Sequence, residues 1–324
     1  MTQPLRLGIA GLGTVGIGVV KILRNKAGLL QQRTGRELVI TAVSARDRQK
    51  DRGVALTDYA WENDPVDLAQ RDDVDVFVEL MGGHDGPALE ATKAALAAGK
   101  DVVTANKAML AHFGHELATM AEEKNALIRF EAAVAGGIPV IKSLTEGLAG
   151  NRISRVMGVM NGTCNYILTQ MQATGRGYDA LFEECAELGY LEADPMLDVG
   201  GIDAGHKLSL LSAIAFGTRV DFASVALEGI QHIALEDIEQ ADDMGYRIKL
   251  LGVAQMSDTG LEQRMSPCLV PKASPIGQLE GGTNMVVIEG DEVGRIVLGG
   301  PGAGAGPRSE EHTSELQSQF RISY

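Results

Sequence analysis

The residues best suited to chemistry lie in the stretch 187–207, where Lys207 closes a run of acidic side chains at Glu192, Asp194, Asp198 and Asp203. Asp203 and Lys207 are four residues apart, so they share one face of a helix. Apolar residues continue that face at Leu210, Leu211 and Ile214. A lysine in such a partly desolvated place can donate a proton or hold a substrate oxygen, and the carboxylates can hold a substrate ammonium group. The alternative is a solvated ion pair over a polar loop.

A loop and a helix must position these groups. Asp194-Pro195 and Gly200-Gly201 are turn signals, so the chain up to Gly201 is predicted to be loop. From Ile202 onwards the apolar spacing predicts a helix. A helix over 178–188 is predicted to lead into this stretch.

A glycine-rich loop follows directly after the first predicted strand, Leu5 to Ala10. The loop has the pattern G-x-G-x-x-G and consists of Gly11, Leu12, Gly13, Thr14, Val15 and Gly16. A strand before it and a helix after it form the context in which this pattern binds the pyrophosphate of a dinucleotide. A purely structural turn is the alternative.

The end of the second predicted strand, 38–43, bears on the choice of cofactor. Enzymes that use NAD usually place an acidic residue there to bind the ribose hydroxyls. Here Ser44 and Arg46 suit the 2′-phosphate of NADP better, although the nearby Asp47 keeps NAD open. Arg46 could also be an ordinary solvated side chain.

Lys107 follows the predicted strand 101–104, which ends in Thr104. Ligands of doubly wound sheets bind beyond the carboxyl ends of the strands, so Lys107 is expected to reach the crevice for nicotinamide or substrate. A surface lysine that opens a helix is the alternative, but a helix N-terminus is an unfavourable place for a cation.

Two further segments are weaker candidates. Glu131 stands at the end of a predicted strand, 127–131, ahead of small and apolar residues, and its carboxylate with nearby carbonyls could bind a monovalent cation. Close packing is the alternative for such small residues. Thr163 opens a predicted helix after the strand 152–160, where its hydroxyl could hold a substrate or belong to an ordinary capped turn.

The order of elements predicts an α/β protein. Strands and helices alternate up to Glu131, which indicates a doubly wound, Rossmann-like nucleotide-binding domain over 1–137. The strands predicted after residue 247 indicate an α+β substrate-binding and dimerisation domain with an antiparallel or mixed sheet over 138–307. Within it, 301–307 begins a return to the first domain.

The composition narrows the class of protein. The net charge of −14 and the aromatic content of 4% argue against a nucleic-acid partner. Three scattered cysteines indicate neither a disulfide framework nor a zinc site. The sequence shows no signal peptide and no apolar run of membrane-spanning length, so a cytoplasmic enzyme is expected.

The tail 308–324 changes character abruptly and shows no apolar periodicity. Arg308 to Ser318, RSEEHTSELQS, resembles the translation of a sequencing adapter. We therefore expect this tail to be non-native, and expect no helix after the second glycine-rich turn, 299–307.

Four motifs taken together resemble the homoserine dehydrogenase family. They are GLGTVG at 11–16, ANK at 105–107, NGTCNYIL at 161–168 and GYLEADPMLDVGGIDAGHK at 189–207. The last motif is highly specific, whereas the glycine loop alone is not. The resemblance covers about residues 5–307. It implies reversible, NAD(P)-dependent interconversion of L-aspartate 4-semialdehyde and L-homoserine in threonine, methionine and isoleucine biosynthesis.

The resemblance also implies roles for individual residues. Lys207 would be the catalytic acid and base, and Lys107 a second lysine near substrate and cofactor. Glu192 and Asp203 would bind the substrate amino group or a water that bridges to it, and Asp198 would support the lysine, while Thr163 stays a substrate-binding candidate from its position alone. The cofactor, NADP or NAD, would contact Gly11, Gly13, Thr14, Val15, Gly16, Arg46, Thr104, Lys107 and Gly302. A monovalent cation, usually sodium in the family, would bind Glu131 and the carbonyls of Val134, Gly136 and Ile138.

The resemblance implies a homodimer. Many bacterial members of the family add a regulatory domain, which we expect to be missing here. Two other functions remain open at this stage. One is an NADP-dependent reductase of the same architecture with another small substrate, which the spacing of Glu192, Asp203 and Lys207 disfavours. The other is a cofactor-binding regulator without turnover, which the presence of both lysines disfavours.

Overall fold

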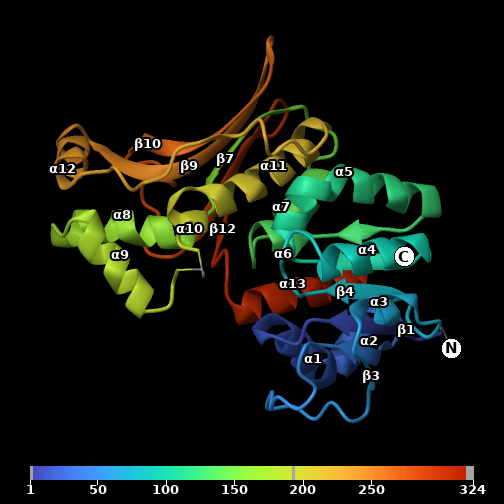
Figure 1. Cartoon of the computed structure of the whole chain (residues 1–324). Coiled ribbons are helices and arrows are strands. Elements are labelled where there is room, and N and C mark those ends of the chain that lie inside the picture. The colour runs from blue at the N-terminus through green and yellow to red at the C-terminus, as the bar shows by residue number, and fades with distance from the viewer. Residues whose placement is uncertain (1–2, 192–193, 319–324) are drawn as a thin grey trace. The chain divides into compact units, whose positions relative to one another are not determined.

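The computed structural model describes residues 3–191 and 194–318. The chain divides into two compact units (Figure 1). The first combines Met1–Gly137 with Gly304–Tyr324, and the second consists of Ile138–Ala303. The first unit is therefore built from two separate segments of the sequence.

The first unit contains a six-stranded parallel sheet with the order β3-β2-β1-β4-β5-β6. Its strands are β1 (Leu5–Ala10), β2 (Leu38–Ser44), β3 (Ala60–Glu62), β4 (Val76–Glu79), β5 (Asp101–Thr104) and β6 (Ile128–Arg129). Its helices before the second unit are α1 (Thr14–Asn25), α2 (Ala27–Thr34), α3 (Pro65–Gln70), α4 (Pro87–Ala97), α5 (Lys107–Lys124) and α6 (Glu131–Val134). The strand order reverses beside β1, which creates the switch point where such sheets bind ligands.

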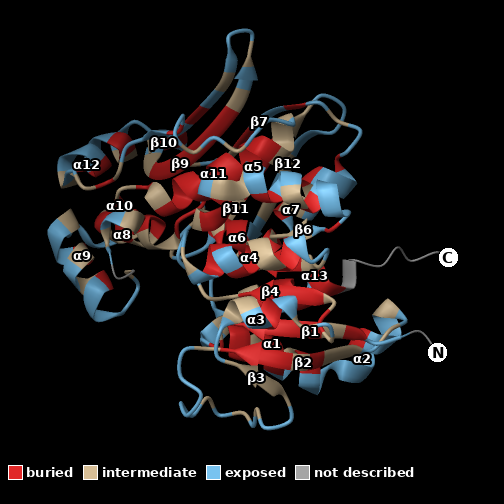
Figure 2. Cartoon of the chain, turned by 45° about the vertical axis from the view of Figure 1, so that its right-hand side comes forward, coloured by how far each residue is buried: buried red, intermediate tan, exposed pale blue. Residues whose placement is uncertain are grey.

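Apolar side chains of β1 and α1 form the centre of the first core, together with β2 and β4. One cluster of buried side chains includes Leu5, Leu7, Ile9, Val19, Val20, Leu23, Val43, Val76 and Val78. Figure 2 shows the buried strands of this sheet in red. The predicted doubly wound fold is confirmed.

The second unit contains a six-stranded mixed sheet with the order β12-β11-β7-β9-β10-β8. Its strands are β7 (Ile153–Val159), β8 (Ala226–Leu227), β9 (Tyr246–Ser257), β10 (Gly260–Pro271), β11 (Asn284–Gly290) and β12 (Gly294–Gly300). Its helices are α7 (Val140–Lys142), the π-helical turn η1 (Ser143–Gly147), α8 (Gly162–Thr174), α9 (Tyr178–Glu187), α10 (Met196–Val199), α11 (Ile202–Phe216) and α12 (Leu235–Asp243). Among the described strands of this sheet, the short β8 pairs in parallel with β10 and the other pairings are antiparallel, so the predicted mixed sheet is also confirmed.

Three local predictions are wrong. The strand expected to run to Glu131 ends at Arg129, because its pairing with β5 covers only two residues and Phe130 leaves the extended conformation with ψ 32°. The segment before Gly201, predicted to be loop throughout, contains the short helix α10. The helix expected to be missing after the second glycine-rich turn is present as α13 (Ala305–Ser318).

Helix α13 packs directly on α1. A Cβ atom added to Gly18 of α1 would lie 2.1 Å from Ser309 Oγ, so the two helices meet where α1 has no side chain. Ser309 Oγ also donates a hydrogen bond of 2.9 Å to the carbonyl of Val15. Among the described residues, no helix combines the length and the apolar character required to cross a membrane.

Candidate active site

Lys207 and Asp203 form a buried ion pair on α11. Lys207 Nζ lies 2.8 Å from Asp203 Oδ2, and the side chains are only 6% and 9% exposed. Lys207 Nζ also donates a hydrogen bond of 2.8 Å to the carbonyl of Met160, at the end of β7. Because two fixed oxygens hold the ammonium group, its position is set by both α11 and the sheet.

Asp198 joins this region through the turn that opens α8. Asn161 Nδ2 donates to Asp198 Oδ1 at 2.9 Å, while Asn161 Oδ1 accepts from the Cys164 amide at 2.8 Å. One asparagine therefore caps α8 and holds a buried carboxylate. The Cys164 thiol donates to the carbonyl of Asp198, and burial raises the pKa of this thiol well above its ordinary value. Cys164 is thus a packing residue rather than a nucleophile.

Thr163 and Glu192 are the remaining residues predicted to bind the substrate. The Thr163 hydroxyl donates to the carbonyl of Tyr190 at 3.1 Å, which ties the start of α8 to the segment after α9. The ring of Tyr190 stands edge-on to that of Tyr166 at 5.5 Å. Glu192 lies outside the described residues, so its predicted role stays a prediction.

A second buried lysine supports the same turn. Lys249 of β9 donates 2.7 Å to Asn165 Oδ1 and also to the carbonyl of Leu279. Asn165 Nδ2 in turn donates 2.7 Å to the carbonyl of Gly281. Lys249 was not among the predicted site residues, although a lysine within the apolar run of β9 is a visible signal in the sequence.

The glycine-rich loop of the first unit has the backbone that a pyrophosphate needs. Gly11 has φ +96°, and a Cβ there would lie 2.3 Å from the carbonyl of Leu80. A Cβ at Gly16 would lie 2.0 Å from the Gly11 carbonyl, whereas a Cβ at Gly13 would meet nothing within 4 Å. Gly11 and Gly16 therefore permit close packing, and Gly13 leaves one side of the loop open.

The N-terminus of α1 fits an anion. Thr14 and Val15 form its first turn, and among the described residues no side chain caps Gly13 and no acidic residue stands in this turn. Amides and the helix dipole at such an end favour a phosphate. The residues present thus fit a dinucleotide on this loop.

Arginines surround the predicted ribose end of the site. Arg46 is exposed on the loop after β2, and Ser44 is buried. Arg52 was not among the predicted site residues, but its Nε donates a hydrogen bond of 3.2 Å to the carbonyl of Leu12 within the glycine-rich loop. The guanidinium groups of Arg48 and Arg52 each lie 5.8 Å from the centre of the Trp61 ring.

Two more predicted cofactor residues lie at the carboxyl end of β5. Thr104 is fully buried, and its hydroxyl donates to Glu79 of β4 at 2.6 Å. Lys107 is half-buried and begins α5 directly after the capping residue Asn106. In the second unit, Gly302 has φ +71° and packs so closely on Asn284 that an added Cβ would lie 2.1 Å from its Cγ.

The residues predicted to bind the cation are all buried. Glu131 is 8% exposed and opens α6, while Val134, Gly136 and Ile138 are each buried as well. The Glu131 amide donates to Glu315 of α13. Of the described residues, no three His, Cys, Asp or Glu side chains gather as a metal cluster. A single carboxylate with carbonyl oxygens suits a hard cation such as sodium, not a soft metal.

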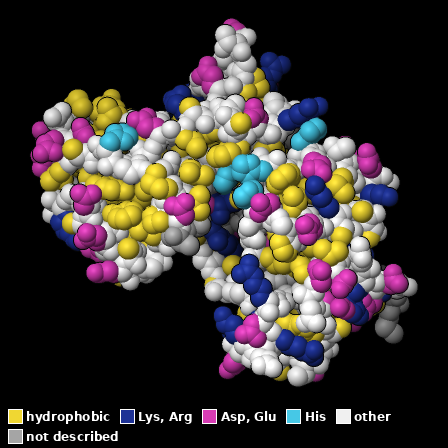
Figure 3. Space-filling model, viewed as in Figure 1, with side chains coloured by type: hydrophobic (Ala, Val, Ile, Leu, Met, Phe, Trp, Pro, Cys, Tyr) yellow, Lys and Arg dark blue, Asp and Glu magenta, His cyan; other side chains and the backbone are white. Residues whose placement is uncertain are grey.

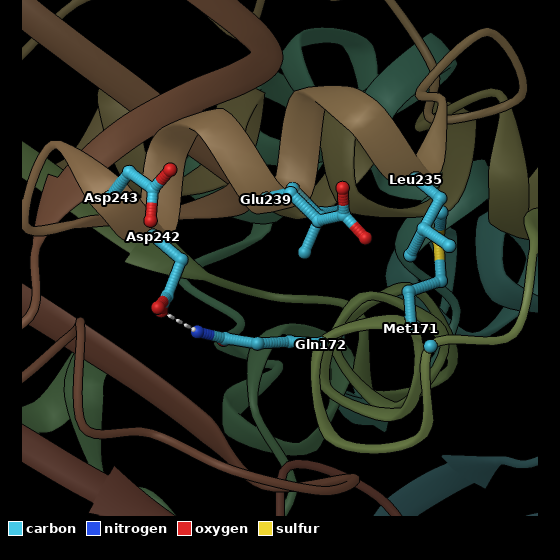
Figure 4. A pocket seen from close by; sticks show the side chains of 8 residues that line it. Met171, Gln172, Leu235, Glu239, Asp242 and Asp243 are labelled. Atoms are coloured by element: carbon cyan, nitrogen blue, oxygen red, sulfur yellow. Dashed lines mark hydrogen bonds between the residues drawn. The ribbon is translucent and has the colours of Figure 1, made fainter.

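A separate pocket lies between α8 and α12, away from Lys207. It measures about 340 Å³, and its lining includes Gln172, Glu239, Asp242 and Asp243 (Figure 4). Lys272 lies 2.6 Å from Asp242 and holds the pKa of that carboxyl below its ordinary value. Figure 3 shows acidic and basic side chains interspersed over the visible face.

Comparison with known proteins identifies relatives over nearly the whole chain. Residues 11–131 match the family model "Homoserine dehydrogenase, NAD binding domain", and residues 139–311 match the model "Homoserine dehydrogenase". A homoserine dehydrogenase of Neisseria gonorrhoeae is 44% identical over 320 residues, which are 99% of this chain and 73% of the relative. One of Pseudomonas aeruginosa is 42% identical over 98% of this chain and 73% of the relative.

Solved structures agree with these matches. The crystal structure of a homoserine dehydrogenase from Thiobacillus denitrificans superposes with a TM-score of 0.94 at 42% identity, covering 97% of this chain and 72% of that one. A hyperthermophilic archaeal homoserine dehydrogenase in complex with NADPH superposes with a TM-score of 0.82 at 25% identity, covering 99% of both chains.

Proposed function

Because the chain belongs to the homoserine dehydrogenase family, we propose that it interconverts L-aspartate 4-semialdehyde and L-homoserine in threonine, methionine and isoleucine biosynthesis. The protein is an NAD(P)-dependent oxidoreductase with a nicotinamide cofactor. The observation that carries the assignment of its chemistry is the buried Lys207 held between Asp203 and the Met160 carbonyl. We propose a cytoplasmic location, where reduced nicotinamide cofactor is regenerated.

Lys207 is the proposed catalytic acid and base. A nicotinamide cofactor held by the glycine-rich loop would supply a hydride to the aldehyde carbon, so that negative charge would develop on the carbonyl oxygen. The Lys207 ammonium stabilises that charge and donates the proton, and it accepts the proton back in the reverse direction. Asp203 and the Met160 carbonyl keep Nζ in one place during both steps.

The acidic residues hold the amino group of the substrate in this proposal. Glu192 and Asp203 bind the ammonium group or a water that bridges to it, and Thr163 contributes its hydroxyl. Asp198 supports the lysine side of the site from the Asn161 cap. Lys107 is the proposed second lysine near substrate and cofactor. An amino acid with one ammonium and one carboxylate group needs both signs of charge in its site.

NADP is the proposed preferred cofactor, bound by the glycine-rich loop with Arg46, Thr104, Lys107 and Gly302. Arg46 and Arg52 support this choice, since both lie on the loop after β2, which ends in Ser44 and not in the acidic residue usual for NAD. A relative of the same fold was solved in complex with NADPH. The test compares kcat/KM for NADPH and NADH in the wild type and in Arg52→Ala. The variant should lose selectivity for NADPH and keep its activity with NADH, whereas equal loss with both would contradict the role.

A monovalent cation, sodium by preference, is proposed at Glu131 and the carbonyls of Val134, Gly136 and Ile138. Burial of a single carboxylate beside bent backbone supports the site. Replacing sodium by choline should lower the Tm and the activity of the wild type, and the Tm of Glu131→Gln should no longer respond to this exchange. Equal responses of both proteins would contradict the site.

A homodimer is proposed through the sheet of the second unit. Large apolar side chains on three of its strands are exposed, namely Met256 at 44%, Leu269 at 52% and Val297 at 38%. Sedimentation equilibrium should give twice the chain mass at micromolar concentration. Leu269→Glu should shift the protein towards monomer. A wild type with the mass of a single chain would refute the proposal.

The central experiment removes the proposed acid. Lys207→Met should lower kcat with NADPH and L-aspartate 4-semialdehyde by at least about 10²-fold, the range that a positioned proton donor contributes. NADPH binding, measured by cofactor fluorescence, should stay close to that of the wild type.

Lys249→Met is the matched control, since Lys249 is the second buried lysine among the described residues of this unit. Its side chain contacts Asn165 and the Leu279 carbonyl rather than Asp203 or the Met160 carbonyl, so the loss of kcat should be much smaller than in Lys207→Met. Equal loss of binding and turnover in Lys207→Met would remove its catalytic role. Binding without turnover in the wild type would favour another substrate or a silent cofactor binder.

A further inference from the structure

Glu79 is a fully buried carboxyl group in the centre of the first sheet. It is the last residue of β4, where strand pairing places it beside Ala10 of β1 and Thr104 of β5. Both neighbouring strands end at these partners. A buried carboxyl group is unfavourable unless hydrogen bonds replace its lost hydration. Its burial at the ligand-binding edge of the sheet therefore requires a physical explanation.

Three donors, one from the end of β5 and two from the loop after β4, point at this one group. The Thr104 hydroxyl donates to Oε2 at 2.6 Å, and the amides of Met81 and Gly82 donate to Oε1 at 2.7 Å and 3.3 Å. All three donors are uncharged. Both carboxyl oxygens of Glu79 thus act as acceptors, one towards β5 and one towards the loop after β4.

The loop after β4 packs directly against the glycine-rich loop and forms one side of the proposed cofactor site. The carbonyl of Leu80 lies so close to Gly11 that an added Cβ would be 2.3 Å away. Gly82 and Gly83 follow with φ +79° and +88°, a conformation that favours glycine. Because Glu79 accepts from the amides just after Leu80, it fixes the path of this loop.

The second loop connects β5 to α5 and leads directly into Lys107, the first residue of α5. Thr104 Oγ1 accepts a bond of 2.9 Å from the amide of Asn106, and Asn106 Nδ2 donates 2.5 Å to the carbonyl of Gly83. Asn106 Oδ1 also caps α5 by accepting from the Met109 amide at 3.1 Å. The chain of contacts from Glu79 therefore reaches the residue immediately before Lys107 and returns to the first loop.

We propose that Glu79 is a positioning residue that sets the cofactor loop and the first turn of α5 at once. It acts through Leu80, Gly82 and the Thr104–Asn106 pair rather than by touching the ligand. Loss of its acceptor oxygens lets the two loops move apart, so NADPH binding weakens and kcat falls. The effect on kcat rests on the proposed role of Lys107, whereas the effect on NADPH binding does not.

The test uses two threonines of equal burial. Thr104 and Thr92 are both fully buried in the first unit, and Thr92 Oγ1 has no hydrogen-bond partner among the described residues. Thr104→Val removes the link to Glu79 without changing size, and should raise the Kd of NADPH about tenfold and lower kcat by a similar factor. Thr92→Val should leave both within about twofold.

Substitutions of Glu79 itself give a graded series. Glu79→Gln keeps an acceptor for the loop amides and should lose less NADPH affinity than Glu79→Leu, which removes both acceptors. In a double-mutant cycle, Glu79→Gln and Thr104→Val should be less than additive in NADPH affinity, whereas Glu79→Gln and Thr92→Val should be additive. If Glu79→Leu does not fold, the cycle of Glu79→Gln with Thr104→Val still decides the question, because Thr104 is itself a proposed cofactor residue and only the cycle isolates its link to Glu79.

Variants that lower the Tm but leave the Kd of NADPH and kcat unchanged would show a merely structural role and overturn the proposal. Equal behaviour of Thr104→Val and Thr92→Val would also overturn it. A wild type that binds NADPH but does not turn over L-aspartate 4-semialdehyde would refute the substrate assignment alone, because the NADPH affinities would still test Glu79.

Discussion

At the scale of single residues, the two buried lysines of the second unit differ in their partners. Lys207 has a carboxylate at 2.8 Å, whereas the hydrogen bonds of Lys249 Nζ go to neutral oxygens. Burial, with a smaller contribution from Arg247, lowers the pKa of Lys249 from 10.5 to about 8, and Glu280 opposes this only weakly. Lys249, whose partners are neutral, thus carries an uncompensated cost of desolvation. At Lys207 the attraction of the Asp203 carboxylate offsets such a cost.

This difference predicts how stability depends on pH. Between pH 8 and pH 10.5 the unfolded chain binds a proton at Lys249 that the folded chain does not. The free energy of unfolding therefore rises with pH across this window, by up to about 3 kcal/mol from this residue. Below pH 8 both states are protonated, and the cost of the buried charge is present in full.

Urea unfolding of the wild type and Lys249→Met at several pH values between 7.5 and 10.5 measures this contribution. Burial raises the pKa of Cys185 to about 11, so this thiol makes the free energy of unfolding fall as pH rises. Subtracting the unfolding free energies of the two proteins cancels this and other contributions that they share. The advantage of Lys249→Met should shrink as pH rises. Parallel curves for the two proteins would contradict the assignment.

At the scale of elements, α13 is unusual in the face that it buries. The described buried residues of α13 are mostly polar, and Leu316 is the one large apolar side chain among them. The others are Ser309, Glu311, His312, Thr313 and Glu315. Such a helix lacks the apolar stripe that periodicity detects. This explains why the sequence predicted no helix here.

The packing of α13 on α1 can be tested by size. Gly18→Ala would place a Cβ 2.1 Å from Ser309 Oγ and 2.8 Å from Ser309 Cβ, so the helices must separate. Overpacking of this kind costs about 1–3 kcal/mol, and the Tm of Gly18→Ala should fall accordingly.

Ser309→Gly in the Gly18→Ala background removes both clashing atoms and should recover most of the lost Tm. The single variant Ser309→Gly serves as the control for the lost hydrogen bond to Val15. Unchanged stability of Gly18→Ala would show that α13 does not dock on α1 in solution.

At the scale of the whole molecule, the chain leaves the first unit at Gly137 and re-enters it at Gly304. The glycine-rich loop and α13 therefore belong to one unit, although about 290 residues separate Gly16 from Ala305. The proposed acid Lys207 lies in the other unit. Cofactor binding and proton transfer are thus assigned to different parts of the fold.

This division predicts a local response to cofactor. NADPH at about 100 times its Kd should stabilise the unit that binds it by about 2.7 kcal/mol. Hydrogen exchange should then slow at β1 and β4 more than at β9 and β10. Equal slowing in both units would contradict the assignment of the glycine-rich loop as the main binding element.

The sequence by itself determined the features that depend on near neighbours. The G-x-G-x-x-G loop after β1 and the i,i+4 spacing of Asp203 and Lys207 fix which groups share a turn or a helix face. Alternation of strands and helices fixed the fold class, because each apolar stripe must be buried against another element. The specific motif around Lys207 also identified the family.

Only the tertiary structure decided which distant groups meet. The Met160 carbonyl on Lys207, Asp198 on Asn161 and Glu79 on Thr104 are contacts between residues at least 25 apart in sequence. They depend on strand register and helix docking, which no local spacing encodes. Helix α13 was missed for the same reason, since its position is set by the space beside Gly18 and not by a periodic apolar pattern.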